Sequence, residues 1–299
     1  MRELAEWRET ARQFAWQGHR IAYWTSGADR PPLLLLHGFP TASWDWHAVW
    51  EPLAERHRLI ACDMLGFGLS AKPEGGYSLH AQADLQFALL DHLGVGEADV
   101  LAHDYGVSVA QEMLARQNAG VASARLRSIY FLNGGLIPGE HRPRLIQRIG
   151  AGPFGWIVGR LMNRRRFGKS FGAVFGPDTQ PSETEMDTFW TLVSEGDGHR
   201  KLHRLLHYMH DRAEHRDRWV DALREADIPL GILNGALDPV SGRHLFEAAM
   251  REAPNLKGTV LSDVGHYPQV EAPERVVAAY RTFAIRAARR PCPRTTASC

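Results

Sequence analysis

Three residues have the types and the chain order needed for nucleophilic catalysis: Asp104, Asp238 and His266. Each follows a short apolar run, in the segments LAHDYG, NGALDP and DVGHYP. A carboxylate is ionised at neutral pH and can attack carbon without a base. A histidine oriented by a second carboxylate can activate water. The sequence therefore predicts a nucleophile, an acid and a base, in this chain order.

Asp104 lies at a predicted turn between a strand and a helix, in the segment LAHDYGVSVAQ. Such a turn strains the backbone and needs a small residue two positions later, which Gly106 supplies. Asp tolerates left-handed dihedral angles better than most residues. It is also a favoured helix N-cap, so a capping role is the alternative interpretation. Asp238 and His266 also follow predicted strands, which favours the interpretation of Asp104 as a nucleophile over that of a helix cap.

Two backbone N–H groups are expected to face the nucleophile. One belongs to Tyr105, directly after Asp104, and the other to Phe39 in the segment HGFP. Gly38 allows close approach of the backbone there. Two such donors would form an oxyanion hole for a tetrahedral intermediate.

Asp104, Asp238 and His266 all follow predicted strands, and open parallel sheets place their sites at the carboxyl ends of the strands. Short apolar runs alternate with helical patterns along the chain, which indicates βαβ units and helices on both faces of the sheet. With a leading hairpin, the pattern predicts an α/β fold with a mostly parallel sheet of about eight strands. The predicted strands are a hairpin over 12–25, then 33–36, 59–63, 100–103, 126–132, 230–233 and 259–261, and the predicted helices are 44–56, 79–93, 107–116, 243–252 and 274–289.

Residues 135–227 interrupt the alternation and are rich in Arg, Trp and His. We interpret them as a helical cap inserted after the sixth strand, which leaves 1–134 and 228–299 as the core. The tail from about 288, which includes the segment RRPCPRTTASC, is predicted to be disordered.

Composition narrows the functional classes. The chain has 299 residues, 44% hydrophobic and 23% charged, with a formal net charge of +1, which gives no global attraction for nucleic acid. Cys62, Cys292 and Cys299 lack metal or redox spacing, which favours a reducing compartment. The first residues lack the apolar core of a signal peptide, and apolar runs are too short for a bilayer. We expect a cytoplasmic monomer or homodimer without a cofactor, away from membranes, that acts with water on a small apolar organic substrate.

A family resemblance adds to these inferences. The segments HGFPTASWDW, DMLGFGLSAKP, HDYG, LDPV and GHYP resemble the epoxide hydrolase and haloalkane dehalogenase branch of the α/β-hydrolase superfamily. Within it, HDYGVSVAQEML, NGGLIPGEHRP, FGPDTQPSE and RDRWVDAL are most similar to the mesoderm-specific transcript family, from about residue 12 to 285. The resemblance implies an α/β-hydrolase fold and an alkyl-enzyme ester on Asp104. Water activated by the pair His266–Asp238 would then hydrolyse that ester.

The leaving group separates the possible activities. Epoxide opening produces an alkoxide that needs an acid, and the resemblance implies a cap tyrosine. Between 135 and 227 the sequence has Tyr208, with His207 as another candidate. Dehalogenases of this branch use a Trp after the nucleophile and often an Asn in the HGxP loop, where this chain has Tyr105 and Phe39. An epoxide hydrolase is therefore favoured. A haloalkane dehalogenase, an ester or lactone hydrolase, and a non-catalytic binding or regulatory protein on the same scaffold remain alternatives.

Other residues have weaker signals, and each could equally be structural. His199, His203 and His207 are spaced along one helix face and could hold a metal, but we predict no metal site. The basic segment 160–169 follows the apolar segment PFGWIVG and could touch an anionic membrane, although a solvated loop is favoured. Possible pocket residues are His37, Trp44, Trp46, His103 and Trp190.

Overall fold

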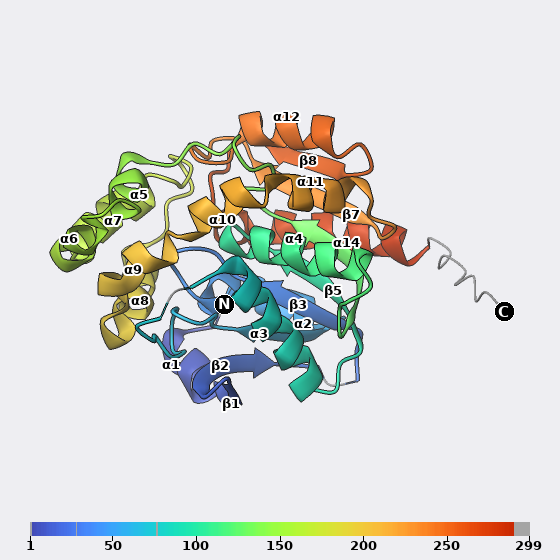
Figure 1. The fold of residues 1–299 in the computed structure, drawn as a ribbon, viewed down its shortest axis with the longest axis horizontal. Helices are drawn as coiled ribbons and strands as arrows, with labels where there is room; N and C mark the ends of the chain where they lie inside the picture. Colours follow the sequence, from blue (N-terminus) through green and yellow to red (C-terminus); the bar gives the residue numbers. More distant parts are fainter. Residues whose placement is uncertain (1, 28, 76, 290–299) are drawn as a thin grey trace.

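The computed structural model describes residues 2–27, 29–75 and 77–289. Eight strands form one sheet in the order β1-β2-β4-β3-β5-β6-β7-β8 (Figure 1). Strand β2 pairs antiparallel with β1 and β4, and the remaining pairs are parallel, which confirms the predicted mostly parallel sheet. The strands are β1 Arg12–Trp16, β2 His19–Thr25, β3 Pro32–Leu36, β4 Arg58–Cys62, β5 Glu97–Ala102, β6 Arg125–Phe131, β7 Leu230–Gly235 and β8 Lys257–Leu261.

The central strand β3 shows how the sequence builds the two apolar layers. Its side chains alternate between faces, so Leu34 and Leu36 join one hydrophobic cluster while Leu33 and Leu35 join the other. All four are buried, and each contributes about 1.5–3 kcal/mol of hydrophobic stabilisation. The first cluster is covered by α3 Leu79–His92, α4 Tyr105–Asn118, α11 Arg216–Arg224 and α12 Arg243–Glu252, and the second by α1 Leu4–Glu9, α2 Trp50–Ala54 and α14 Pro273–Ala288.

The insertion after β6 is helical, as predicted. Figure 1 shows α5 to α9 grouped beyond one end of the sheet, while α10 and α11 run beside α4. Helix α11 packs on α4 and returns the chain to the start of β7. The helices of this segment are α5 Leu145–Gly150, α6 Gly155–Leu161, α7 Arg164–Gly172, α8 Glu183–Ser194, the 3-10 turn Glu195–Asp197, α9 Gly198–Leu205, α10 Tyr208–Glu214 and α11.

Two segments differ from the sequence prediction. The helix predicted over 44–56 is split into a 3-10 turn, Ser43–Trp46, and α2. The reason is that Ser43 and Asp45 bond to distant loops: Ser43 donates to Asp63, and Asp45 accepts from Gly38. Helix α1 was not predicted. The tail that the sequence predicts to be disordered contains Cys292 and Cys299. Its residues 290–299 lie outside the described residues, whereas Ala288, at the end of α14, and Arg289 are described.

None of the helices within the described ranges combines the length and the apolar character needed to cross a membrane.

Candidate active site

Asp104 occupies the sharp turn between β5 and α4. Its backbone has φ 45° and ψ −103°, a conformation that non-glycine residues rarely adopt. Although Asp104 is at the N-cap position of α4, its side chain makes no capping hydrogen bond. The neighbouring Gly106 is required sterically, because a Cβ atom there would lie 2.5 Å from the carbonyl oxygen of Leu36. The turn therefore directs the Asp104 carboxylate away from the helix and leaves it available for other contacts.

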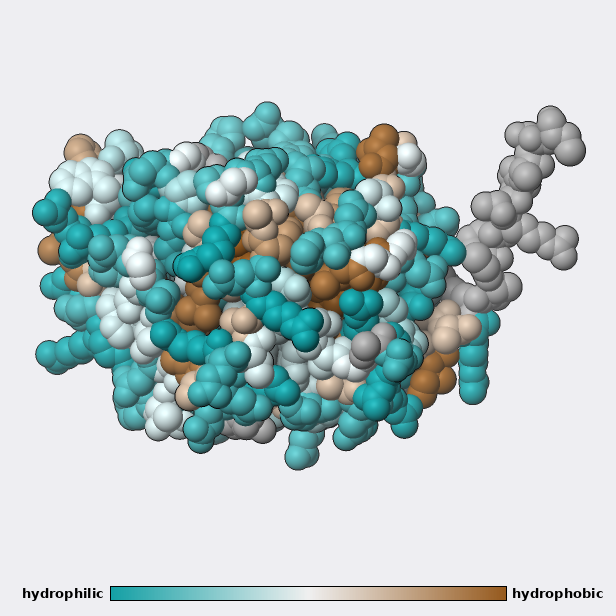
Figure 2. Space-filling model, turned by 90° about the horizontal axis from the view of Figure 1, so that it is seen from below, coloured by the Kyte–Doolittle hydropathy of each residue, from teal (hydrophilic) through white to brown (hydrophobic). Residues whose placement is uncertain are grey.

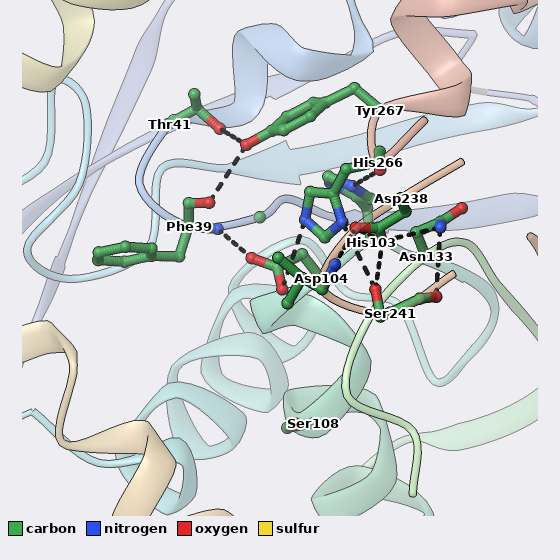
Figure 3. A network of polar contacts seen from close by, with 12 residues as sticks. Phe39, Thr41, His103, Asp104, Ser108, Asn133, Asp238, Ser241, His266 and Tyr267 are labelled. Carbon is green, nitrogen blue, oxygen red and sulfur yellow. Dashed lines mark hydrogen bonds and ion pairs between the residues drawn. The ribbon is translucent and has the colours of Figure 1, made fainter. Parts of the chain in front are cut away.

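The HGFP loop after β3 brings a backbone donor to this carboxylate. The Phe39 N–H donates to Asp104 Oδ2 at 3.0 Å (Figure 3). The Tyr267 hydroxyl donates to the carbonyl of Phe39 at 3.2 Å, which fixes the orientation of the loop. Gly38 is needed here as well, because a Cβ atom would lie 2.7 Å from His103 Nδ1. The Tyr105 N–H is at the first position of α4, where no intrahelical acceptor exists.

His266 and Asp238 complete the group. His266 Nδ1 donates to Asp238 Oδ2 at 2.6 Å, while His266 Nε2 lies 3.8 Å from Asp104 Oδ1 (Figure 3). Asp238 also accepts from the Ser241 hydroxyl at 2.6 Å and from Asn133 Nδ2 at 2.9 Å. The three residues come from the loops after β5, β7 and β8, so the sheet brings together the residues that the sequence singled out.

Mutual contact sets the charges of this group. Burial alone would lower the pKa of His266, but the carboxylates of Asp238 and Asp104 outweigh it and raise that pKa to about 10. Burial would raise the pKa of Asp104, yet contacts with His266 and Arg212 bring it below its usual value. The pKa of Asp238 is lowered too, since His266 outweighs its burial. The group thus holds two carboxylates around one imidazolium.

Arg212 of α10 is a second cation at the nucleophile, and no pattern in the sequence predicts it. Its side chain is buried, with Nη2 4.0 Å from Asp104 Oδ1 and 3.1 Å from the Asp104 carbonyl oxygen, to which it donates. It also donates to the Ser108 hydroxyl at 2.8 Å. Arg212 therefore ties the cap to the nucleophile turn.

A cavity of about 110 Å³ lies between the core and the cap. Asp104 and His266 line it from the core, together with Phe39 and Tyr267. Most of the remaining wall is apolar and comes from the cap. The cap residues that line the cavity include Ile146, Val158, Met162, Phe167, Phe171, Val174, Leu202 and Leu206. The reactive groups thus face a small, largely apolar space.

The two candidate acids differ in their placement. Tyr208 is buried; its ring is 5.8 Å from that of Phe39 and 4.4 Å from Arg212 Cζ, and its hydroxyl lies 3.4 Å from Nε2 of the cavity-lining Gln147. Burial raises the pKa of this phenol. His207 is largely exposed and its Nε2 faces Asp211 at 3.4 Å. Tyr208 is therefore adjacent to the cavity, whereas His207 faces outward.

The two predicted pocket histidines support the loops of the site. The Met64 N–H donates to His37 Nε2 at 3.0 Å, and His37 Nδ1 donates to the Gly38 carbonyl. His103 Nε2 donates to the His266 carbonyl at 2.9 Å. Burial lowers the pKa of His37 and lowers that of His103 to about 3. Both are neutral residues that hold backbone groups in place.

The predicted pocket tryptophans lie elsewhere. Trp44 stacks on His47 with ring centroids 3.8 Å apart, and Trp46 is fully buried in the second hydrophobic cluster. Trp190 packs between Phe167 and His199. They contribute to the packing around the cavity rather than to its wall.

The histidines singled out for metal binding are separated by their contacts. His199 packs on Trp190, and His203 lines the cavity with Nδ1 bonded to the Arg200 carbonyl. His207 instead lies with His210 and Asp211, and one ligand atom from each falls within 4.8 Å of the others. Asp211 already accepts the Leu79 N–H at 2.8 Å, so this group carries no argument for a metal.

Comparison with known proteins agrees with the resemblance inferred from the motifs. Residues 31–273 match the alpha/beta hydrolase fold family. The chain is 41% identical over 293 residues to the mesoderm-specific transcript homolog protein of Homo sapiens, a match that covers 94% of this chain and 87% of the human protein.

Two solved structures have a similar fold. The epoxide hydrolase CorEH gives a TM-score of 0.76 at 23% identity, over 93% of this chain and 99% of that one. The haloalkane dehalogenase DbeA from Bradyrhizobium elkani gives 0.77 at 25% identity, with the same coverage. Because neighbours with two different activities are equally similar, likeness of fold does not identify the leaving group.

Proposed function

The chain belongs to the alpha/beta hydrolase fold family, and on this premise we propose that it is a hydrolase with Asp104 as covalent nucleophile, acting on an apolar epoxide. The observation that carries the proposal is the carboxylate at the turn before α4. It is uncapped, faces the Phe39 N–H and His266 Nε2, and lines an apolar cavity.

In the first step, Asp104 attacks one epoxide carbon. A carbon–oxygen bond forms to the carboxylate while the carbon–oxygen bond of the ring breaks, and its electron pair goes to the epoxide oxygen. That oxygen takes a proton from Tyr208, which leaves a phenolate beside Arg212. The cation of Arg212, 4.4 Å from the ring, stabilises the developing charge. The product of this step is a hydroxyalkyl ester of Asp104.

In the second step, water attacks the ester carbonyl and His266 takes its proton. The tetrahedral oxyanion accepts hydrogen bonds from the Phe39 and Tyr105 N–H groups. Its collapse releases the diol and restores the Asp104 carboxylate, while His266 keeps the proton of the water and is again the imidazolium of the resting protein. One water is consumed in each cycle.

Esterification itself prepares His266 for this role. In the resting protein its pKa is raised to about 10, with Asp238 and Asp104 acting against burial, so the imidazole is protonated. The ester carries no charge, so one of the two carboxylates that hold the proton disappears. The pKa of His266 then falls, its proton passes to the phenolate of Tyr208, and the neutral imidazole becomes able to activate water.

The epoxide is favoured over a halide because Tyr105 and Phe39 stand at the positions where dehalogenases of this branch have the Trp and Asn that bind the departing halide. The Tyr105 ring packs against those of Phe67 and Tyr208, and Phe39 has no polar side-chain atom. An ester substrate fits poorly, because a carboxylate attacking an acyl carbon would produce a mixed anhydride.

A single turnover in heavy-oxygen water tests the proposal, with a panel of small epoxides and parallel assays for halide release and for ester and lactone cleavage. We expect the label to enter Asp104 first, and the His266→Gln variant to accumulate an adduct of protein plus epoxide in mass spectrometry. Label passing directly into the diol would exclude the ester route. Halide release without epoxide turnover would reassign the leaving group, and no turnover in any assay would favour a binding or regulatory protein.

A further inference from the structure

The cap carries an exposed apolar surface on one short helical hairpin. Nine large apolar residues are exposed among the described residues, and six of them lie between 145 and 161. They sit on α5, on α6 and on the loop that joins the two helices, which we call the α5–α6 hairpin. These six residues are Leu145, Ile149, Phe154, Trp156, Ile157 and Leu161, with exposed fractions from 37% to 69%.

Packing on the opposite side keeps this surface outward. A Cβ atom at Gly159 would lie 2.7 Å from the His199 carbonyl oxygen on α9, and one at Gly155 would lie 1.8 Å from that of Gly150. The inner side of the hairpin therefore has room only for glycine at these positions. The six exposed apolar side chains lie on the other side, and Figure 2 shows brown side chains among teal ones at the left edge, where Figure 1 draws α5 to α7.

The charge around this surface is strongly one-sided. Residues 141–177 contain eight Lys or Arg and no Asp or Glu, although the whole chain has 35 Lys or Arg and 34 Asp or Glu. Within the described residues, Arg148, Arg160, Arg165 and Lys169 are exposed and make no ion pair. Exposed apolar side chains surrounded by unpaired cations match the chemistry of an anionic lipid surface.

We propose that the α5–α6 hairpin docks the protein on an anionic bilayer surface, with Phe154 and Trp156 inserted among the lipids and the flanking cations at the headgroups. This interaction surface is independent of the chemistry at Asp104. From the sequence alone, only the basic segment 160–169 suggested a membrane contact, and a solvated loop was favoured. The fold adds the six exposed apolar side chains, which the sequence did not reveal. The same hairpin lines the cavity with Ile146, Gly150 and Val158, so docking brings the cavity wall to the membrane.

Vesicle flotation of the full chain tests the proposal. We expect binding to vesicles of phosphatidylcholine with phosphatidylglycerol, weak binding to phosphatidylcholine alone, and loss of binding at high salt. The double variant Phe154→Ser/Trp156→Ser should bind at least about tenfold more weakly, because two large apolar side chains no longer leave water. Arg148→Glu/Arg160→Glu should weaken binding to the anionic vesicles.

Matched controls separate a local effect from a general one. Ile285, 48% exposed on α14, lies outside the hairpin, so Ile285→Ser should bind as the parent does. Arg251→Glu on α12 serves as the charge control. Circular dichroism checks that each variant is folded, which we expect because the substituted side chains are exposed.

Tryptophan quenching locates the contact. Trp156 is the one tryptophan of the nine that is exposed, and Trp190 is half-buried. Brominated lipids should therefore quench a component of the fluorescence that Trp156→Phe removes. Absence of vesicle binding, equal binding by the double variant, or quenching that persists in Trp156→Phe would overturn the proposal. So would a dimer that the double variant converts to monomer, since a second copy would then cover the hairpin.

Discussion

At the residue scale, the nucleophile Asp104 is balanced by two cations of different origin. His266 comes from the core and contacts Asp104 through Nε2, whereas Arg212 comes from the cap and reaches the same carboxylate oxygen. Together with Asp238 they form a buried group of two carboxylates and two cations. Such a balance lets charged groups remain in a largely apolar site.

Replacing Arg212 tests this balance. In Arg212→Met, the Ser108 hydroxyl and the Asp104 carbonyl lose a donor, which should reduce the free energy of unfolding by about 1–3 kcal/mol. Ester formation should slow by at least about tenfold, because the phenolate of Tyr208 loses its stabilising cation. Rapid-quench mass spectrometry of the adduct and thermal melts measure the two effects.

The control for Arg212 is Arg200→Met, an exposed cap residue paired with Asp197 at 3.6 Å, which should change neither value appreciably. Arg212→Lys should recover part of the rate, because it keeps the charge without the forked donors. A purely structural role would instead lower stability in Arg212→Met and leave the rate of ester formation unchanged.

The pH dependence of ester hydrolysis is a second test at this scale. His266 must be neutral to take a proton, so the rate should rise with pH and level off above the pKa of His266 in the ester. That pKa should lie below the value of about 10 in the resting protein, because the ester removes the charge of Asp104. Decay of the adduct after mixing and pH jump gives the profile.

Asp238→Asn supplies the comparison for this profile. It removes the other carboxylate that raises the pKa of His266, so its inflection should move to still lower pH, with a lower plateau. A rate that does not change with pH in either protein would rule out His266 as the base.

At the scale of elements, the strand-turn-helix between β5 and α4 depends on one glycine. Gly106→Ala should improve helix propensity by about 1 kcal/mol. A Cβ atom 2.5 Å from the Leu36 carbonyl oxygen opposes this gain, because overpacking against rigid backbone costs about 1–3 kcal/mol. We expect a net loss of stability and a displaced nucleophile, so ester formation should fall as well.

Gly96→Ala is the matched variant, since a Cβ atom there meets nothing within 4 Å. Its stability in a urea titration should equal or slightly exceed that of the parent. A Gly106→Ala protein as stable and as active as the parent would contradict the steric role of this position.

The elements differ in how well their sequences specify them. The strands before the site could be predicted because a run of three to five apolar residues ends close to a Gly, Asn or Asp turn signal, as in β3 and β5. The cap helices could not be bounded individually. Several have only six to nine residues, too few for a stable isolated helix, so tertiary packing determines them. The break at Ser43–Trp46 likewise depends on Asp63, a distant partner.

The residues of the site also divide into those that local sequence predicts and those that it does not. Asp104, Asp238 and His266 follow strand ends, so local patterns and chain order identified them. Asn133 could have been found in the same way, because it follows β6 at the same edge. Arg212 could not, since nothing in its local sequence distinguishes it from the other arginines of the cap.

At the scale of the whole molecule, Glu112 joins three helices on one face of the sheet. From α4 it accepts from Trp219 at 2.9 Å and from Arg218 on α11, and it contacts His80 on α3. Burial would raise the pKa of Glu112, but His80, Arg218 and Trp219 outweigh it and lower the pKa. Its stabilising contribution is therefore present above the pKa of an unfolded glutamate and is lost as the pH falls through the lowered folded pKa.

Glu112→Gln should lower the free energy of unfolding by about 2–4 kcal/mol near neutral pH, because buried charged donors lose their acceptor. The difference from the parent should shrink in acid. Urea titrations across the acidic range measure both. Glu225→Gln, an exposed residue on the same face, should leave the curve unchanged. A constant difference at every pH would mean that the ionisation of Glu112 does not stabilise the fold.

The bridge from Arg212 to the nucleophile also links cap opening to the state of the reaction. Arg212 is attracted to a charged Asp104 and not to its neutral ester, so by reciprocity the ester must weaken the hold on α10. The cap should therefore be held closed more tightly before the reaction than in the covalent intermediate, in which α10 should open more often. Hydrogen–deuterium exchange of α10 amides in the trapped His266→Gln adduct should be faster than in the unreacted variant. Equal exchange would show that the cap does not sense the charge.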